Sequence, residues 1–201
     1  MLIFPFIRYS LWLAIIFVFV FYGVDYFSTQ REEYLALYCA WERSIPYVPQ
    51  AFFFYYSVVF LPFAVPAFVQ TEDDIRVWAY TMGICMLVAG IAFLFFPSDT
   101  GYIQTSEESQ SLLRRATLLI AGRHNLVPSL HVAFTFVVLS TIWGHQRKLG
   151  RTIFFAWGLL LTISTLLTHQ HHIIDVLAGM ILGFSSFRFS NLCFKSGKRK
   201  S

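Results

Sequence analysis

Two long stretches of the chain carry almost no charge, and this feature constrains the fold more than any other. Residues 44–71 contain no charged residue, and residues 152–187 contain only Asp175. A helix crosses the hydrocarbon core of a bilayer with about 20 mostly apolar residues. Of the 201 residues, 57% are hydrophobic and 13% are charged. A soluble domain of this size could not bury so much apolar surface, and disorder or a disulfide scaffold is excluded. We expect a polytopic membrane protein.

The apolar segments predict an all-α fold with about six transmembrane helices. The first is interpreted as an uncleaved anchor rather than a signal peptide, because no A-x-A-like cleavage site follows it. Pro62 and Pro66 should kink the second. The last apolar stretch is too long for one crossing, so we expect two short helices joined by a turn near 168–171. The predicted spans lie at about 9–24, 51–69, 77–97, 128–143 and, as a pair, within 152–187.

Six crossings place both termini on one side of the membrane. Ten of the 15 Lys and Arg residues belong to that side, four of them in the tail 195–200, and five belong to the other side. The positive-inside rule therefore predicts cytoplasmic termini, in the cell membrane if the source is bacterial. The basic tail is expected to meet anionic membrane lipids rather than nucleic acid. We expect residues 1–201 to form a single membrane-embedded domain with a catalytic core at about 77–190.

Residues 99–127 interrupt the apolar pattern with a charged segment. Three of the five basic residues on the non-cytoplasmic side fall here, namely Arg114, Arg115 and Arg123. Apolar residues recur in the same segment at helical spacing, which predicts a short helix lying on the membrane interface. These apolar residues are Leu112, Leu113, Ala116, Leu119 and Ile120.

Asp175 is the one acidic residue inside a predicted span, and such a position is functional by default. On a helix, His171 would lie four residues earlier on the same face. The carboxylate could then accept a hydrogen bond from one imidazole nitrogen, which fixes the tautomer and leaves the other nitrogen free to attack. A purely structural His–Asp pair is the alternative interpretation.

The segment Val127-Pro128-Ser129-Leu130-His131 forms a second cluster. Proline suits the first position of a helix, so the backbone amides of Ser129 and Leu130 are expected to point outward and to bind phosphate. The Ser129 hydroxyl would add a donor, and His131 would add a proton source. The alternative is an ordinary capped transmembrane helix that happens to contain a histidine.

By the predicted topology, both clusters face the non-cytoplasmic side, and together they suit phosphoryl transfer through a phosphohistidine. His171 would attack phosphorus and Asp175 would hold it. His131 would protonate the leaving oxygen and later activate the acceptor. Cations and backbone donors would stabilise the equatorial oxygens. We therefore expect no cofactor and no metal ion, with a lipid phosphate or phospholipid as substrate.

These motifs resemble those of the type 2 phosphatidic acid phosphatase superfamily. PSLH at 128–131 is similar to its PSGH-type second signature, and STLLTHQHHIIDVLAG at 164–179 to its third, S-R-x5-H-x3-D. The Leu in PSLH and the residues of the second stretch are closer to those of the branch that contains the inositolphosphotransferases and inositol phosphorylceramide synthases. The resemblance implies a lipid phosphatase or phosphotransferase with His171 as nucleophile and His131 as acid. It also implies phosphate-binding roles for Ser129 and Ser164.

The sequence departs from the family pattern at two cationic positions. The first signature, K-x6-R-P, is absent after the third span, and Thr165 stands where the third signature has Arg. A phosphodiester carries one negative charge and needs fewer cations than a dianionic monoester, which favours a head-group phosphotransferase. Arg123, six residues before Ser129, is the best local substitute, followed by Arg114 and Arg115.

Three other functions remain as alternatives. The missing first signature would suit a catalytically inactive scaffold of the same fold. His131 and His145 lie 14 residues apart, a spacing that could hold stacked haems in a redox protein. A serine hydrolase built on Ser129 lacks a nucleophile-elbow context.

Overall fold

Four helices of the computed structural model are long and apolar enough to cross a membrane. The structure describes residues 2–102, 111–120 and 124–198, and within these ranges it contains helices and one isolated bridge, between Leu35 and Ser98, but no strand. The predicted all-α, multi-pass fold is confirmed. The four candidate spans are Ile3–Ser28, Glu72–Phe95, Lys148–Leu167 and Ile173–Phe194.

The first span is longer than the predicted 9–24. It consists of α1 (Ile3–Phe17), a π-helical turn (Val18–Tyr22) and α2 (Gly23–Ser28). The prediction began after Arg8 because a charge inside a span is costly. In the structure the Arg8 side chain is 61% exposed, and its guanidinium lies 3.5 Å from the Glu72 carboxylate, at the end of the bundle. The long side chain thus carries its charge out of the apolar zone.

The second predicted span is a bent pair of helical segments. Pro49–Val59 and Leu61–Phe68 meet at an angle of 43° and together qualify as one broken span. Pro62 stands directly after the bend and has no N–H to donate, so the predicted kink is confirmed there, whereas Pro66 lies within the helix Ala64–Phe68. The regular helices within the pair are α3 (Phe52–Tyr56) and α4 (Ala64–Phe68).

The remaining spans fall close to their predicted positions. Thr71 caps α5 (Glu72–Phe95) by accepting a hydrogen bond from the Asp74 amide. The helix α8 (Leu130–Trp143) has 14 residues, about 21 Å of length, which is shorter than a bilayer core of about 30 Å. The predicted turn near 168–171 is confirmed between α9 (Lys148–Leu167) and α10 (Ile173–Lys198).

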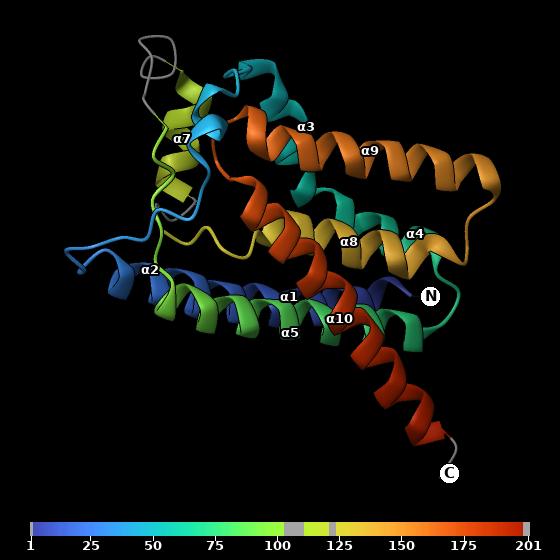
Figure 1. Cartoon of the computed structure of the whole chain (residues 1–201). Coiled ribbons are helices and arrows are strands. Elements are labelled where there is room, and N and C mark those ends of the chain that lie inside the picture. Colours follow the sequence, from blue (N-terminus) through green and yellow to red (C-terminus); the bar gives the residue numbers. More distant parts are fainter. Residues whose placement is uncertain (1, 103–110, 121–123, 199–201) are drawn as a thin grey trace.

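The spans pack side by side with α8 among them. Figure 1 shows α1 beside α5, and α8 contacts α5, α9 and α10. Val137 and Val138 of α8 are fully enclosed. The N-terminus and the far end of α10 lie toward the end of the bundle opposite α7 (Leu112–Ile120). We call the end that carries α7 the α7 end.

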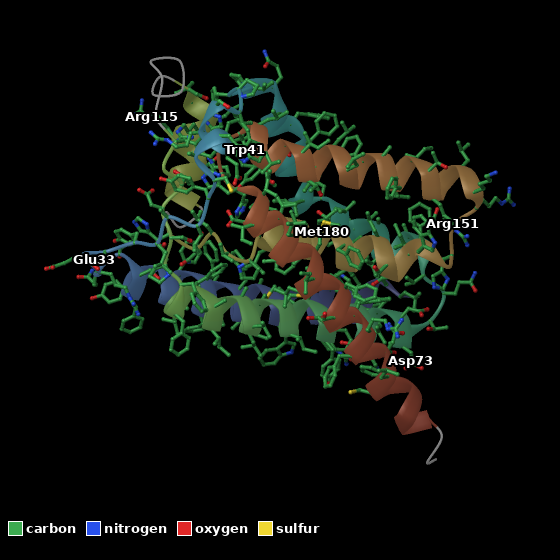
Figure 2. The ribbon with its side chains drawn as sticks, in the orientation of Figure 1. Glu33, Trp41, Asp73, Arg115, Arg151 and Met180 are labelled. Carbon is green, nitrogen blue, oxygen red and sulfur yellow. The ribbon has the colours of Figure 1, made fainter. Side chains whose placement is uncertain are left out.

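Charge gathers at the two ends of the bundle, and the zone between them is apolar on its outside. Figure 2 shows Arg115 and Glu33 at the α7 end and Asp73 and Arg151 at the other. Large apolar side chains are exposed along the length of the spans, as expected where the solvent is lipid. Examples are Trp12, Phe19, Val88, Leu159 and Ile181.

The helix predicted within 99–127 is present as α7. Its Leu112 and Leu113 side chains are 77% and 46% exposed, whereas Arg114 is buried. Leu112 and Leu113 therefore point away from the protein, as they would if α7 lay against lipid.

Two glycines let α10 approach α8 closely. Gly179 and Gly183 are four residues apart on one face of α10. A Cβ atom added to Gly179 would lie 2.5 Å from the Ser129 carbonyl oxygen, and one added to Gly183 would lie 2.9 Å from the Ala133 carbonyl oxygen. Small residues at this spacing allow membrane helices to pack backbone against backbone.

Gly179→Ala should destabilise the bundle, because the new methyl group would meet backbone that cannot move aside. We expect a cost of about 1–3 kcal/mol and an apparent Tm several degrees lower in detergent. The matched control is Gly83→Ala, since a Cβ there meets only Leu13 Cδ2 at 3.9 Å. Equal Tm values for the two variants would contradict the close contact.

Candidate functional site

The turn between α9 and α10 is fixed by backbone hydrogen bonds that end on Thr165. The amides of Gln170 and His171 both donate to the Thr165 carbonyl at 3.1 Å, and His169 adopts a positive φ of 56°. Thr165 is fully buried. At the position where the related signature has Arg, this chain thus has a buried threonine, whose hydroxyl donates to the Thr162 carbonyl at 2.8 Å.

His171 and Asp175 meet as the sequence predicts, but by a different local structure. The His171 Nδ1 lies 3.3 Å from Asp175 Oδ2, and both side chains are buried. His171 precedes α10 instead of lying on it. The expectation that His171 and Asp175 share one face of a helix is therefore wrong. Asp175 sits in the first turn of α10, and its Oδ2 also accepts from the His172 amide at 2.8 Å. The carboxylate thus caps the helix and orients the imidazole at once.

Ser129 caps α8, which corrects one part of the prediction. Its hydroxyl oxygen accepts from the Val132 amide, and its own amide donates to the Asp175 carbonyl at 3.0 Å. Ser129 is fully buried. Pro128 therefore precedes the cap instead of occupying the first helical position, and the Ser129 amide is not available to a phosphate. The Leu130 amide remains a predicted ligand.

His131 lies beside His171 at the α7 end of α8. The two ring centroids are 5.8 Å apart, and the His131 ring stacks on Tyr55 at 4.2 Å. The two predicted clusters thus bring their histidines, His131 and His171, close together. The hydrogen bond from Ser129 to the Asp175 carbonyl ties the two clusters together through the backbone.

Both histidines line a cavity of about 480 Å³ inside the bundle. At one end it is bordered by polar residues, namely Tyr56, Thr117, Asn125 and Gln170 together with the histidines. The rest of its wall is apolar and comes from α1, α5, α8 and the broken span. Among the described residues, its lining contains no Lys or Arg. The apolar residues include Leu13, Phe17, Phe21, Met82, Met86, Phe93 and Phe134.

The structure does not bring Ser164 to this cavity. Its hydroxyl donates to the Leu161 carbonyl within α9 at 2.6 Å, and the side chain is buried. Arg123 lies outside the described residues. Arg115 is exposed on α7, whereas Arg114 is 4% exposed and lies one turn before Thr117, which does line the cavity. The phosphate-binding roles of Ser164 and of these arginines remain predictions.

A second buried cluster behind His171 was not predicted. Glu42 is 2% exposed although it belongs to a short 3₁₀ helix, Ala40–Ser44, in the connection between two spans. Its carboxylate accepts from the amides of Cys39 and Ile173, each at 2.8 Å, and lies 3.2 Å from His172 Nδ1. The other ring nitrogen of His172 contacts the Thr100 carbonyl. Because a carbonyl can only accept, that nitrogen carries a proton.

Aromatic rings surround this second cluster. Tyr102 is parallel to His169 at 3.9 Å and to His172 at 4.5 Å, and Tyr38 stacks on His172 at 4.6 Å. The Tyr102 hydroxyl reaches the His171 carbonyl at 3.4 Å. The His172 ring thus faces partners other than those of the His171 ring. No sequence pattern marks the burial of Glu42, since His172 and Ile173 lie 130 and 131 residues away.

Residues 2–102, 111–120 and 124–198 contain no group of three or more His, Cys, Asp or Glu side chains that could bind a metal ion. The haem interpretation finds no support either. His145 follows the opposite end of α8 and lies 3.7 Å from the Asp74 carboxylate. A nucleophilic Ser129 is disfavoured because its hydroxyl is buried and caps a helix.

Comparisons with known proteins agree with the motifs. A family model described as "PAP2 superfamily" matches residues 33–189, more than three quarters of the chain. An uncharacterised protein of Methanocaldococcus jannaschii is 36% identical over 63 residues, which is 31% of this chain. The matched part spans about a quarter of that protein's length, 26%.

Glu42→Gln should loosen the turn that carries His171. Burial alone would raise the pKa of Glu42, but the amides of Ile173 and Cys39 and the neighbouring His172 outweigh it and lower the pKa. A carboxyl group whose pKa is lower in the folded protein stabilises the fold at pH values above its unfolded-state pKa of about 4.3. This contribution is lost as the pH falls through the folded-state pKa. We expect Glu42→Gln to cost about 1–3 kcal/mol at pH 7.

The difference in Tm between the wild type and Glu42→Gln should therefore shrink below about pH 4. Thermal unfolding in detergent at pH 7 and in this acidic range measures it. Glu33→Gln serves as the control, because Glu33 is exposed and its replacement should change little. A Glu42→Gln penalty that is absent at pH 7, or that grows as the pH falls, would contradict the ionised, bonded carboxylate.

Proposed function

The chain belongs to the PAP2 superfamily, and from this premise we propose that it is a membrane enzyme that transfers the phosphoryl group of a lipid through a phosphohistidine at His171. The observation that carries the proposal is the His131–His171–Asp175 cluster at the polar end of an otherwise apolar cavity. An apolar wall suits an acyl or prenyl chain, and the polar end suits a phosphate.

In the proposed first step the His171 Nε2 attacks phosphorus. The Nδ1 proton is held by Asp175, which stabilises the positive charge that develops on the ring. His131 donates a proton to the leaving oxygen, so the P–O bond breaks and an N–P bond forms. In the second step His131 takes a proton from water or an alcohol, whose oxygen attacks phosphorus and releases His171.

The substrate we favour is a phosphodiester or another lipid with few charges. The described lining of the cavity contains no Lys or Arg, and the cationic first signature is absent from the sequence. A dianionic monoester would demand more compensating charge than a monoanionic diester. We therefore place head-group transfer, as in the inositolphosphotransferase branch, ahead of monoester hydrolysis. We also place the site on the extracytoplasmic side, following the distribution of basic residues.

His171→Ala and Asp175→Asn should each reduce turnover by about 10³-fold or more, because they remove the nucleophile or the group that orients it. The assay supplies phosphatidic acid, polyprenyl diphosphate, phosphatidylinositol and phosphatidylglycerol, and measures free phosphate and transferred head group separately. His145→Ala is the matched control at the other end of α8. Full activity in His171→Ala would end the proposal. An unsubstituted protein inactive on every lipid would favour the inactive scaffold.

In His131→Ala, a good leaving group should restore the rate of the first step. With an alkyl leaving group we expect a loss of about 10²–10⁴-fold. A p-nitrophenyl phosphoester needs no proton on its leaving oxygen, so the variant should release one equivalent of p-nitrophenolate rapidly and then stall as the phosphoenzyme. Stopped-flow absorbance measures the burst. Equal losses with both leaving groups, without a burst, would show that His131 is not the acid.

A further inference from the structure

Asn125 lines the cavity together with the two histidines, and one atom of its side chain is buried without a hydrogen-bond partner in the described part of the protein. The side chain is 5% exposed and lines the cavity. Its amide nitrogen donates to the Phe21 carbonyl at 3.2 Å. A carbonyl cannot donate, so this bond fixes which end of the amide is nitrogen and which is oxygen. The opposite atom, Oδ1, is buried and has no hydrogen-bond partner within the described part of the protein.

A buried acceptor without a donor costs free energy, and a ligand that supplies the donor recovers it. A phosphate oxygen cannot do so, because it is itself an acceptor and carries negative charge. The complementary group is a hydroxyl, which can donate to Oδ1 while its neighbour in the same molecule occupies the phosphate position. Asn125 therefore favours a substrate with a hydroxyl group, which the roles of the histidines do not require.

We propose that Asn125 is a specificity-determining residue whose Oδ1 accepts a hydrogen bond from a hydroxyl group of the substrate. The inference rests on the proposed function for the class of ligand, a phospholipid. The hydroxyl belongs either to the lipid head group or to the alcohol that receives the phosphoryl group. In both cases the cavity selects hydroxylated molecules over equally charged ones that lack a hydroxyl.

Two substitutions separate this role from a structural one. Asn125→Leu and Asn125→Asp both lose the hydrogen bond to the Phe21 carbonyl, so a merely structural residue would make them alike. Asn125→Asp keeps an acceptor at the cavity, whereas Asn125→Leu removes it. The aspartate also adds a negative charge, which weakens every anionic ligand equally and cancels in a ratio of affinities.

The experiment measures binding without turnover, in full-length protein that carries His171→Ala. Dioleoyl phosphatidylglycerol is compared with dioleoyl phosphatidylpropanol, which has the same charge and chains but no head-group hydroxyl. Dissociation constants come from the ligand-induced shift in Tm in detergent. A second arm adds free glycerol to the phosphatidylpropanol complex, which reports on an acceptor alcohol.

With Asn125 or Asn125→Asp, we expect phosphatidylglycerol to bind about fivefold or more tightly than phosphatidylpropanol, or glycerol to bind in the second arm. With Asn125→Leu, the preference should vanish in whichever arm shows it. No preference in either arm with Asn125, or loss of the preference in both variants, would overturn the proposal. Absence of turnover on any lipid by the unsubstituted protein would count against the proposed function alone, since these ratios do not depend on turnover.

Discussion

The close contact between α8 and α10 is the interaction on which the candidate site depends. Gly179 and Gly183 bring the two backbones together, and the Ser129 amide donates to the Asp175 carbonyl across the contact. In lipid, helices gain little from hydrophobic burial against each other, so tight packing and hydrogen bonds decide which pairs associate. The same contact sets the separation of the histidines, because His131 and His171 each lie within four residues of this hydrogen bond.

The cavity that results has two unlike parts, and both suit one kind of molecule. The apolar wall can receive a hydrocarbon chain, while the histidine pair faces the end where a phosphate would lie. The described lining offers no guanidinium or ammonium group, which is why we favour a substrate with few charges. A lipid phosphodiester satisfies both conditions, and a hydroxyl on its head group would satisfy the Asn125 carbonyl as well.

The sequence predicts those features that follow from local pattern. Apolar length predicts the spans, and the prolines predict the bend of the second one, because both depend on residues close together in the chain. The meeting of His171 with Asp175 was predicted too, although a capping turn produces it instead of a helical face. The role of Ser129 as a cap that bonds Asp175, the burial of Glu42 and the orientation of Asn125 could not be predicted. Each is decided by a partner 46 to 131 residues away.

The central claim is that His171 itself carries the phosphoryl group. The most direct measurement is to mix the protein with a lipid that bears ³²P in its phosphate and to quench within milliseconds into alkaline detergent, where a phosphohistidine survives. Fragment mass spectrometry then locates the label. The account predicts a base-stable, acid-labile phosphoryl group on His171 that disappears when the acceptor is added. A label on His131, His172 or a serine, or active turnover without any labelled protein, would contradict it.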